Sequence, residues 1–120
     1  MPLSYSQVQK DVASVSVSVY GGTLNIKYYP SKMTDDIFIK FASLDMVKTI
    51  GDAKEALGNI NEMLADLIKE WDFYEDDEQT VMWALTAESI ARLDMTFKMT
   101  CLTAIMRHIR PEAVLPQIPT

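Results

Sequence analysis

Few side chains in this sequence have the types and spacing that chemistry requires, and the first candidate pair is Cys101 with His108. A thiol acts as a nucleophile when a base lies within hydrogen-bond reach of it, at about 3 Å. The two residues are seven positions apart in a segment with helical periodicity, which separates them by two turns, or ~10.5 Å along the axis. We therefore expect Cys101 to be a buried structural thiol and His108 to interact with the C-terminal dipole of its helix.

A dense acidic segment is the second candidate site. Seven carboxylates fall within thirteen residues, and they are Asp66, Glu70, Asp72, Glu75, Asp76, Asp77 and Glu78. Carboxylate oxygens suit a hard cation such as calcium, but an EF-hand loop alternates its ligands around a central glycine, and this segment does not. No spacing of His, Cys or Gly indicates a zinc site, a phosphate-binding loop or a dinucleotide fold. The sequence thus predicts a solvated acidic loop, with no metal, no cofactor and no catalytic residue.

Composition and charge exclude further classes of protein. The chain has 120 residues, of which 48% are hydrophobic and 23% charged, as in a single globular domain. The whole net charge of −6 lies in residues 61–120, whereas binding to nucleic acid requires a basic surface. No apolar run approaches the ~20 residues that cross a bilayer. A single cysteine excludes an internal disulfide, so we expect a cytosolic protein. From the charge and the short apolar runs, we expect neither nucleic acid nor a membrane as partner.

The N-terminal part of the chain alternates as a β-hairpin does. Its apolar positions fall at every second residue in two runs, and they are Val15, Val17, Val19, Leu24, Ile26 and Tyr28. Gly21-Gly22 between the runs suits the positive φ angles of a two-residue turn, and Pro30 cannot continue the ladder. The pattern predicts a hairpin over residues 12–29, which must pack against another strand or a helix.

Helical periodicity predicts four helices further along the chain, over residues 34–44, 52–70, 87–93 and 95–109. Thr34, Thr86 and Asp94 are the expected N-caps of the first, third and fourth of these helices. The helix over 52–70 carries a single apolar stripe, at Ala53, Ala56, Leu57, Ile60, Met63, Leu64, Leu67, Ile68 and Trp71. Polar and charged residues occupy the rest of its surface, as in an amphipathic helix.

Three polar or small positions carry further expectations about the two longest helices. Asn61 and Lys98 fall on the polar faces of their helices, so we expect both side chains in solvent. Gly58 costs a helix interior roughly 1 kcal/mol relative to alanine, and we expect it to mark a close packing contact.

These segments together predict the fold class. Short apolar runs flank the acidic loop and suggest a second, short strand pair around it. For residues 1–110 the sequence predicts one mostly helical α+β domain, with an N-terminal β-hairpin and a helical bundle. Residues 111–120 hold three of the five prolines and are expected to form a Pro-rich C-terminal tail.

The residues around the acidic loop are similar to a known pattern. Glu70-Trp71-Asp72-Phe73 precedes the loop, and Leu85, Thr86, Glu88, Ile90 and Leu93 follow it before the last helix. This arrangement resembles the tail assembly chaperones of long-tailed, siphovirus-like bacteriophages, in which E-W-D-L/F, an acidic turn and L-T-x-E-x-I/L-x-x-L precede a closing helix. The sequence departs from that pattern in two places: the turn lacks Gly-Lys, and Asp94-Met95 stands where a proline often follows the leucine.

The resemblance implies a non-enzymatic protein of the host cytoplasm that is absent from the mature virion. Such chaperones bind and solubilise the tape-measure protein and help to recruit tail tube subunits, and some have a longer form made by frameshifting. A long helical tape-measure chain has apolar stripes that aggregate when uncovered, and a small acidic protein can cover them with an apolar helical face. We expect the partner-binding residues on the long and last helices, at Ile60, Met63, Leu64, Leu67, Trp71, Met99 and Met106.

Alternatives to these expectations remain open. The residues of the expected partner-binding set also suit an intramolecular core, and for Ile60, Leu64 and Leu67 the core is the favoured interpretation. The chain also suits a small structural subunit of the phage tail or head–tail connector, or a cytosolic regulator whose acidic loop mimics nucleic acid. Self-association is compatible with each of these functions.

Overall fold

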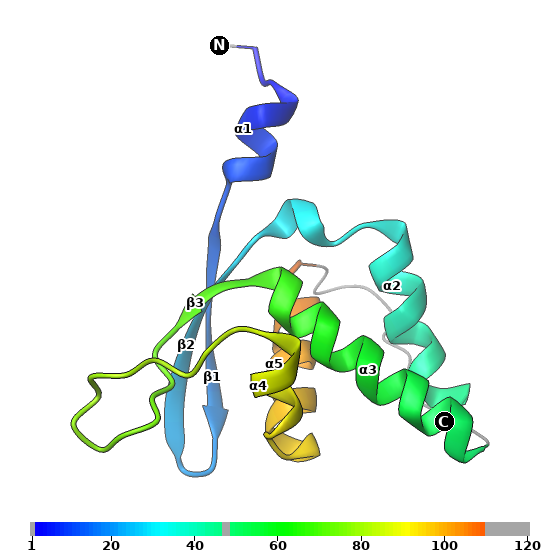
Figure 1. Ribbon diagram of the computed structural model, residues 1–120. Helices are drawn as coiled ribbons and strands as arrows, with labels where there is room; N and C mark the ends of the chain where they lie inside the picture. The colour runs from blue at the N-terminus through cyan, green and yellow to red at the C-terminus, as the bar shows by residue number, and fades with distance from the viewer. Residues whose placement is uncertain (1, 47–48, 110–120) are drawn as a thin grey trace.

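The mostly helical α+β fold predicted from the sequence is present in the computed structural model, which describes residues 2–46 and 49–109 (Figure 1). Within these residues the strands are β1 (Ala13–Val19), β2 (Gly22–Tyr28) and β3 (Ile68–Trp71). The α-helices are α1 (Tyr5–Lys10), α2 (Asp35–Ala42), α3 (Ile50–Leu67), α4 (Ala87–Ala91) and α5 (Met95–Ile109), and the short 3-10 helices are η1 (Pro30–Lys32) and η2 (Ser43–Met46). The predicted tail over 111–120 lies outside the described residues.

The N-terminal hairpin is confirmed, with β1 and β2 paired antiparallel. Its turn differs from the expected Gly21-Gly22, because Gly22 pairs with Val19 and the turn consists of Tyr20 and Gly21. Both turn residues have positive φ angles, 50° and 75°, as a two-residue hairpin turn requires. Tyr20 thus sits at the tip of the hairpin, where its hydroxyl donates a hydrogen bond to the carboxylate of Asp94.

The predicted helix over 52–70 is too long at its C-terminus. The chain leaves the α3 helix at Ile68, where the backbone becomes extended, and residues 68–71 form β3. This strand pairs antiparallel with β2, and Trp71 lies opposite Ile26. Ile68 and Trp71 are both buried. They continue the three- and four-residue steps of the helical stripe, so the apolar pattern alone does not reveal the change from helix to strand.

One hydrophobic core lies between the apolar face of the sheet and helices α3, α4 and α5, with one residue of α2 added to it (Figure 1). From the sheet it takes Val17, Leu24, Ile26, Tyr28, Ile68 and Trp71, and from the helices Phe41, Ile60, Met63, Leu64, Leu67, Ile90, Phe97, Cys101, Leu102, Ile105 and Met106. The opposite face of the sheet carries the serines of β1 and the exposed polar residues of β2. The alternation of apolar and polar residues in the sequence therefore corresponds to a sheet with one buried face and one solvated face.

The second strand pair expected around the acidic loop is reduced to one bridge, between Tyr74 and Met82. Two further backbone hydrogen bonds of 2.8 Å, from Glu75 to Val81 and from Trp83 to Phe73, hold the two arms of the loop together. The arms are too short for a ladder, because the carboxylate of Asp76 closes the loop by accepting from the backbone of Val81 at 3.0 Å.

Helix α1 has no counterpart among the elements predicted from the sequence. Ser4 and Gln7 form a capping box at its start, which satisfies backbone donors at the first turn. The helix buries no residue, so it lacks the apolar periodicity by which the other helices were found. Figure 1 shows it projecting from the end of the sheet.

The helix ends confirm two of the three predicted caps. The Thr86 hydroxyl accepts from the Ser89 backbone at 3.2 Å, and the Asp94 carboxylate accepts from the Phe97 backbone at 3.0 Å. Thr34 precedes α2, but its side chain makes no capping hydrogen bond. The close contact expected at Gly58 is absent, because a Cβ atom there meets nothing within 4 Å. None of the described helices is long and apolar enough to cross a membrane.

Candidate functional site

Cys101 and His108 have separate structural roles. Cys101 is fully buried, and this burial raises the pKa of its thiol to about 12, so the thiol stays protonated at neutral pH. His108 shares a hydrogen bond, through Nδ1, with the hydroxyl of Tyr28. The rings of His108 and Tyr28 also meet edge to face, with centroids 5.7 Å apart. The pair therefore joins the end of α5 to the end of β2.

Three residues of the acidic segment bind other parts of the chain. The Asp72 carboxylate accepts hydrogen bonds from the backbone and side-chain nitrogens of Asn25 at 2.6 and 2.7 Å. Asp76 accepts from the side chain and backbone of Thr80, and these hydrogen bonds, the side-chain one first, hold its pKa below the ordinary value. Glu70 lies 3.5 Å from Lys27 in an exposed ion pair. Across residues 2–46 and 49–109, no group of three or more His, Cys, Asp or Glu residues is placed to hold a metal ion.

Trp71 and Phe73 of the chaperone-like pattern form an aromatic cluster with Trp83 and Phe97. Phe73 lies 4.7 Å from Phe97 and 5.5 Å from both Trp71 and Trp83, measured between ring centroids. Ile90 of α4 is buried in the same core. Leu85 and Leu93 are partly buried against it, whereas Glu88 is exposed in the first turn of α4. The pattern therefore describes the packing of the loop and α4 onto the sheet.

Six of the seven residues expected to bind a partner belong to the core, which corrects that prediction. Ile60, Met63, Leu64, Leu67, Trp71 and Met106 are all buried within the chain. They come from the C-terminal half of α3, from β3 and from one face of α5, and these three surfaces pack against each other and the sheet. Their side chains are therefore not accessible to a partner. Met99 is only partly buried and lines a groove beside β1.

Asn61 and Lys98 were expected in solvent, and both are buried. The Lys98 ammonium donates a 2.9 Å hydrogen bond to the Asn61 side-chain oxygen, which joins α5 to α3. Burial holds the pKa of Lys98 below its ordinary value, and the nearby charge of Asp94 opposes this shift. The two polar groups are buried because each satisfies the other.

The uncovered half of the α3 stripe is the strongest candidate for a functional surface. Residues 50–59 of α3 include no buried residue, whereas the buried positions begin at Ile60. Ile50 is 79% exposed and Leu57 is 40% exposed, although both have the periodicity of a packed helix. On the neighbouring helix α2, Ile39 is 61% exposed. We call this surface, made of α2 and residues 50–59 of α3, the α2–α3 face.

A groove of about 480 Å³ runs between the two helices of the α2–α3 face. Ile39, Leu44 and Ala56 supply its apolar lining, and Lys40 and Glu55 are among its charged residues. Figure 1 shows α2 and the first half of α3 extending beyond the sheet, at the opposite end of the molecule from the acidic loop. A groove that combines apolar side chains with polar and charged ones is suited to hold an amphipathic helix.

The sequence signal for this face was present, because the α3 stripe begins at Ala53 and the face lies at its first turns. What the sequence lacked was a reason to divide the stripe between a buried and an uncovered half. That division is set by where α4, α5 and β3 pack against α3, whose buried positions begin only at Ile60. In comparisons with family models, curated proteins and solved structures, nothing matches this chain.

Proposed function

We propose that this protein is a non-enzymatic tail assembly chaperone of a long-tailed bacteriophage, which acts in the host cytoplasm. In this role it binds and solubilises the tape-measure protein and helps to recruit tail tube subunits. The resemblance of residues 70–93 to such chaperones supports the proposal. The observation that carries it is the α2–α3 face, where Ile39, Ile50 and Leu57 are exposed apolar side chains on two neighbouring helices.

The α2–α3 face binds an amphipathic helix of the tape-measure protein in this proposal. A helix laid along the groove would cover Ile39, Leu44 and Ala56, and an aliphatic side chain such as Ile39 contributes about 1.5–3 kcal/mol when it becomes fully buried. Tape-measure stripes that would otherwise associate with one another are thereby removed from water. Lys40, Glu55 and the other charged residues at the rim set the register of the bound helix rather than its affinity.

The acidic loop contributes solubility to the complex. The net charge of −6 lies in the C-terminal half of the chain, and the acidic loop lies away from the α2–α3 face (Figure 1). Several copies bound along one tape-measure protein would therefore present negative charge outward. Like-charge repulsion between such complexes opposes their aggregation.

Co-expression with the tape-measure protein of the same phage tests the proposal. The fraction of tape-measure protein that stays soluble is measured with the wild-type chain, with Ile39→Glu and with Ala56→Glu, two positions that line the groove. Both substitutions place a charge on the α2–α3 face, and we expect them to reduce the soluble fraction several-fold. Val81→Glu is the matched control, because Val81 is an exposed apolar residue in the loop, outside this face.

Two results would contradict the proposal. The first is a tape-measure protein that is equally soluble without this chain, which leaves no role for a chaperone. Alternatively, mass spectrometry of purified virions would detect the chain in stoichiometric amounts, which identifies a structural subunit of the tail or of the head–tail connector. Circular dichroism of each variant shows whether a variant that no longer solubilises the tape-measure protein is still folded.

A further inference from the structure

Strand β1 is an open edge of the sheet. The strand order β1-β2-β3 gives β1 one neighbour within the described residues. Val19 and Gly22 flank a two-residue turn, so the valines of β1 exchange backbone hydrogen bonds with β2. The backbone N–H and C=O groups of Ser14, Ser16 and Ser18 therefore point away from β2, toward the free edge. These groups are ready to pair with a further strand.

β1 also lacks the features that protect edge strands from pairing. Edge strands are commonly interrupted by charged side chains, proline or a bulge. Ala13–Val19 contains no charged residue and no proline, and its register with β2 is regular. The opposite edge, β3, has four residues, includes Lys69 and Glu70, and pairs with a register irregularity. Of the two edges, β1 is the one that can accept a strand.

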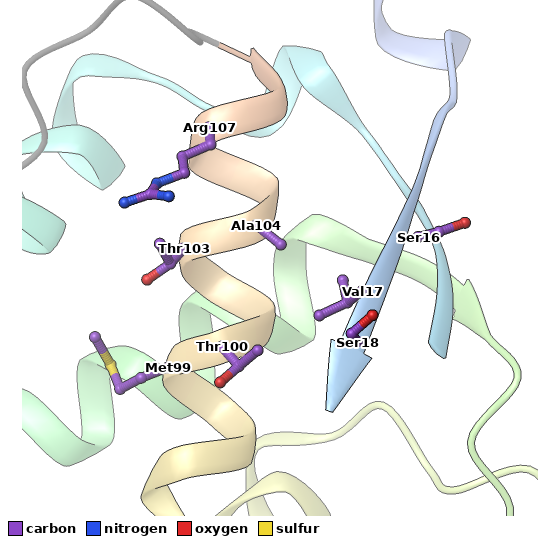
Figure 2. A pocket seen from close by; sticks show the side chains of 8 residues that line it. All are labelled: Ser16, Val17, Ser18, Met99, Thr100, Thr103, Ala104 and Arg107. Atoms are coloured by element: carbon purple, nitrogen blue, oxygen red, sulfur yellow. The ribbon is translucent and has the colours of Figure 1, made fainter. Parts of the chain in front are cut away.

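A groove between β1 and α5 accompanies the open edge (Figure 2). Its volume is about 480 Å³, and on the helix side it is lined by Met99, Thr100, Thr103, Ala104 and Arg107. Figure 2 shows Val17 pointing toward α5, whereas Ser16 points away from it. The lining contains no acidic residue in a chain of net charge −6. Another copy of this acidic chain can therefore approach here without acid facing acid.

We propose that β1 pairs with β1 of a second copy of this chain, antiparallel and around a twofold axis through Ser16. Read outward from Ser16, the strand has valine, serine and then valine or alanine in both directions. Val15 thus lies opposite Val17 of the partner subunit, and Ser14 lies opposite Ser18 of the partner subunit. The register keeps the valines of both copies on one face. The two sheets become one continuous antiparallel sheet with the twofold symmetry common in homodimers.

Charge complementarity at the ends of α5 favours a second copy as the occupant. Asp94, just before α5, is held by Tyr20 at the hairpin tip, and His108 at the end of α5 is held by Tyr28, opposite Ala13. α5 therefore runs antiparallel to β1. The twofold axis then places the end of α5 that carries Arg107 level with Asp94 of the partner subunit. Hydrogen bonding, first from Tyr20, holds the pKa of Asp94 below its ordinary value, so this carboxylate is charged.

The predicted dimer is small and does not depend on the proposed chaperone function. Seven residues at ~3.4 Å each give a seam of about 24 Å. With the flanking groove, the interface buries on the order of 1,000 Å² in total, which is at the lower limit of specific interfaces. We therefore expect reversible dimerisation with a dissociation constant in the micromolar range.

Sedimentation velocity of the full chain tests the dimer between about 5 µM and 0.5 mM, a range that spans micromolar dissociation constants. We expect the wild-type chain to shift from monomer to dimer with increasing concentration. Ser16→Glu places two carboxylates opposite each other at the twofold axis and should keep the chain monomeric. Thr23→Glu is the matched control, because it adds the same charge to the same polar face but on β2, and it should dimerise as the wild type does.

Amide hydrogen exchange gives a second readout that needs no substitution. Exchange at Ser14, Ser16 and Ser18 should slow as the concentration rises, whereas exchange at the valines of β1 should not change with it. A monomer at every concentration would overturn the proposal, and so would equal dimerisation of Ser16→Glu and the wild type. Slow exchange at the three serines that is independent of concentration would also overturn it, because the edge would then be covered within one chain.

Discussion

The indole N–H of Trp71 donates a 3.0 Å hydrogen bond to the backbone carbonyl of Trp83. The indole of Trp83 donates in turn, also at 3.0 Å, to the backbone carbonyl of Ser89. The first hydrogen bond links β3 to the arm of the acidic loop that carries Trp83, and the second links that arm to helix α4. Phe73 packs against both indoles. The chaperone-like pattern of this region has a physical reason in the structure, since its tryptophan supplies both a buried ring and a directed donor.

Replacing Trp71 by phenylalanine should destabilise the fold by about 1–3 kcal/mol. The substitution keeps an aromatic ring but removes the N–H donor, which leaves the Trp83 carbonyl unpaired, and it also opens space in the core. Urea unfolding followed by circular dichroism measures the loss. Val81→Ala, at an exposed position of the same loop, should change the free energy of unfolding by less than about 0.5 kcal/mol. Equal effects of the two variants would contradict the role of the Trp71–Trp83 contact.

The two halves of the α3 stripe should respond differently to truncation. Leu64→Ala removes a fully buried side chain and should cost about 2–5 kcal/mol of unfolding free energy. Leu57→Ala removes a side chain that is 40% exposed, and it should cost less than about 1 kcal/mol, since little cavity forms. Urea denaturation of both variants checks the difference. If Leu57→Ala were as costly as Leu64→Ala, the α2–α3 face would be part of the core rather than a free surface.

The hairpin and the longest helices were predictable from sequence because their side chains obey a single period. The valines of β1 face one side of a sheet in any register, and residues 95–109 keep one apolar face throughout. Ile68 and Trp71 fit a helical period and a strand that faces the core, so the pattern is ambiguous where α3 becomes β3. Only the pairing with β2, a contact distant in sequence, decides between helix and strand.

The candidate surfaces were harder to predict than the fold. A residue of an apolar stripe looks the same in sequence whether it packs within the chain, as Leu64 does, or remains exposed, as Leu57 does. The same limit applies to Asn61 and Lys98, whose burial depends on two helices meeting. The open edge of β1 is likewise a property of strand order. Sequence patterns describe one element at a time, whereas these features arise between elements.

Cys101 should resist alkylation in the folded protein. Its thiol is buried and its pKa is raised to about 12, so both access and the thiolate fraction are low at neutral pH. Mass spectrometry after treatment with iodoacetamide should detect no modification of the native chain and full modification in urea. Because this is the chain's one cysteine, the unfolded protein is its own control. Rapid labelling under native conditions would show that the core around α5 opens frequently.

The buried Lys98 should make the stability of the fold depend on alkaline pH. Burial lowers its pKa in the folded state below the ordinary value of 10.5, despite the opposing charge of Asp94. Below both pKa values, each state is protonated and the folded state bears the cost of a buried ammonium. As the pH rises through the lowered pKa, the folded state loses the proton first, so the unfolded state binds more protons and the free energy of unfolding increases until about pH 10.5.

The difference between the wild type and Lys98→Met isolates this effect. Tyr20 and Tyr28 have pKa values raised above 10.0 in the folded state, so they lower stability as the pH rises past that value. They are present in both proteins, and their contribution cancels in the difference. Urea unfolding from pH 7 to about pH 11 should therefore show the wild type gaining stability relative to Lys98→Met as the pH rises. A difference that stays constant with pH would mean that Lys98 titrates in the folded protein as it does in the unfolded chain, and that its bond to Asn61 leaves the ammonium fully stabilised.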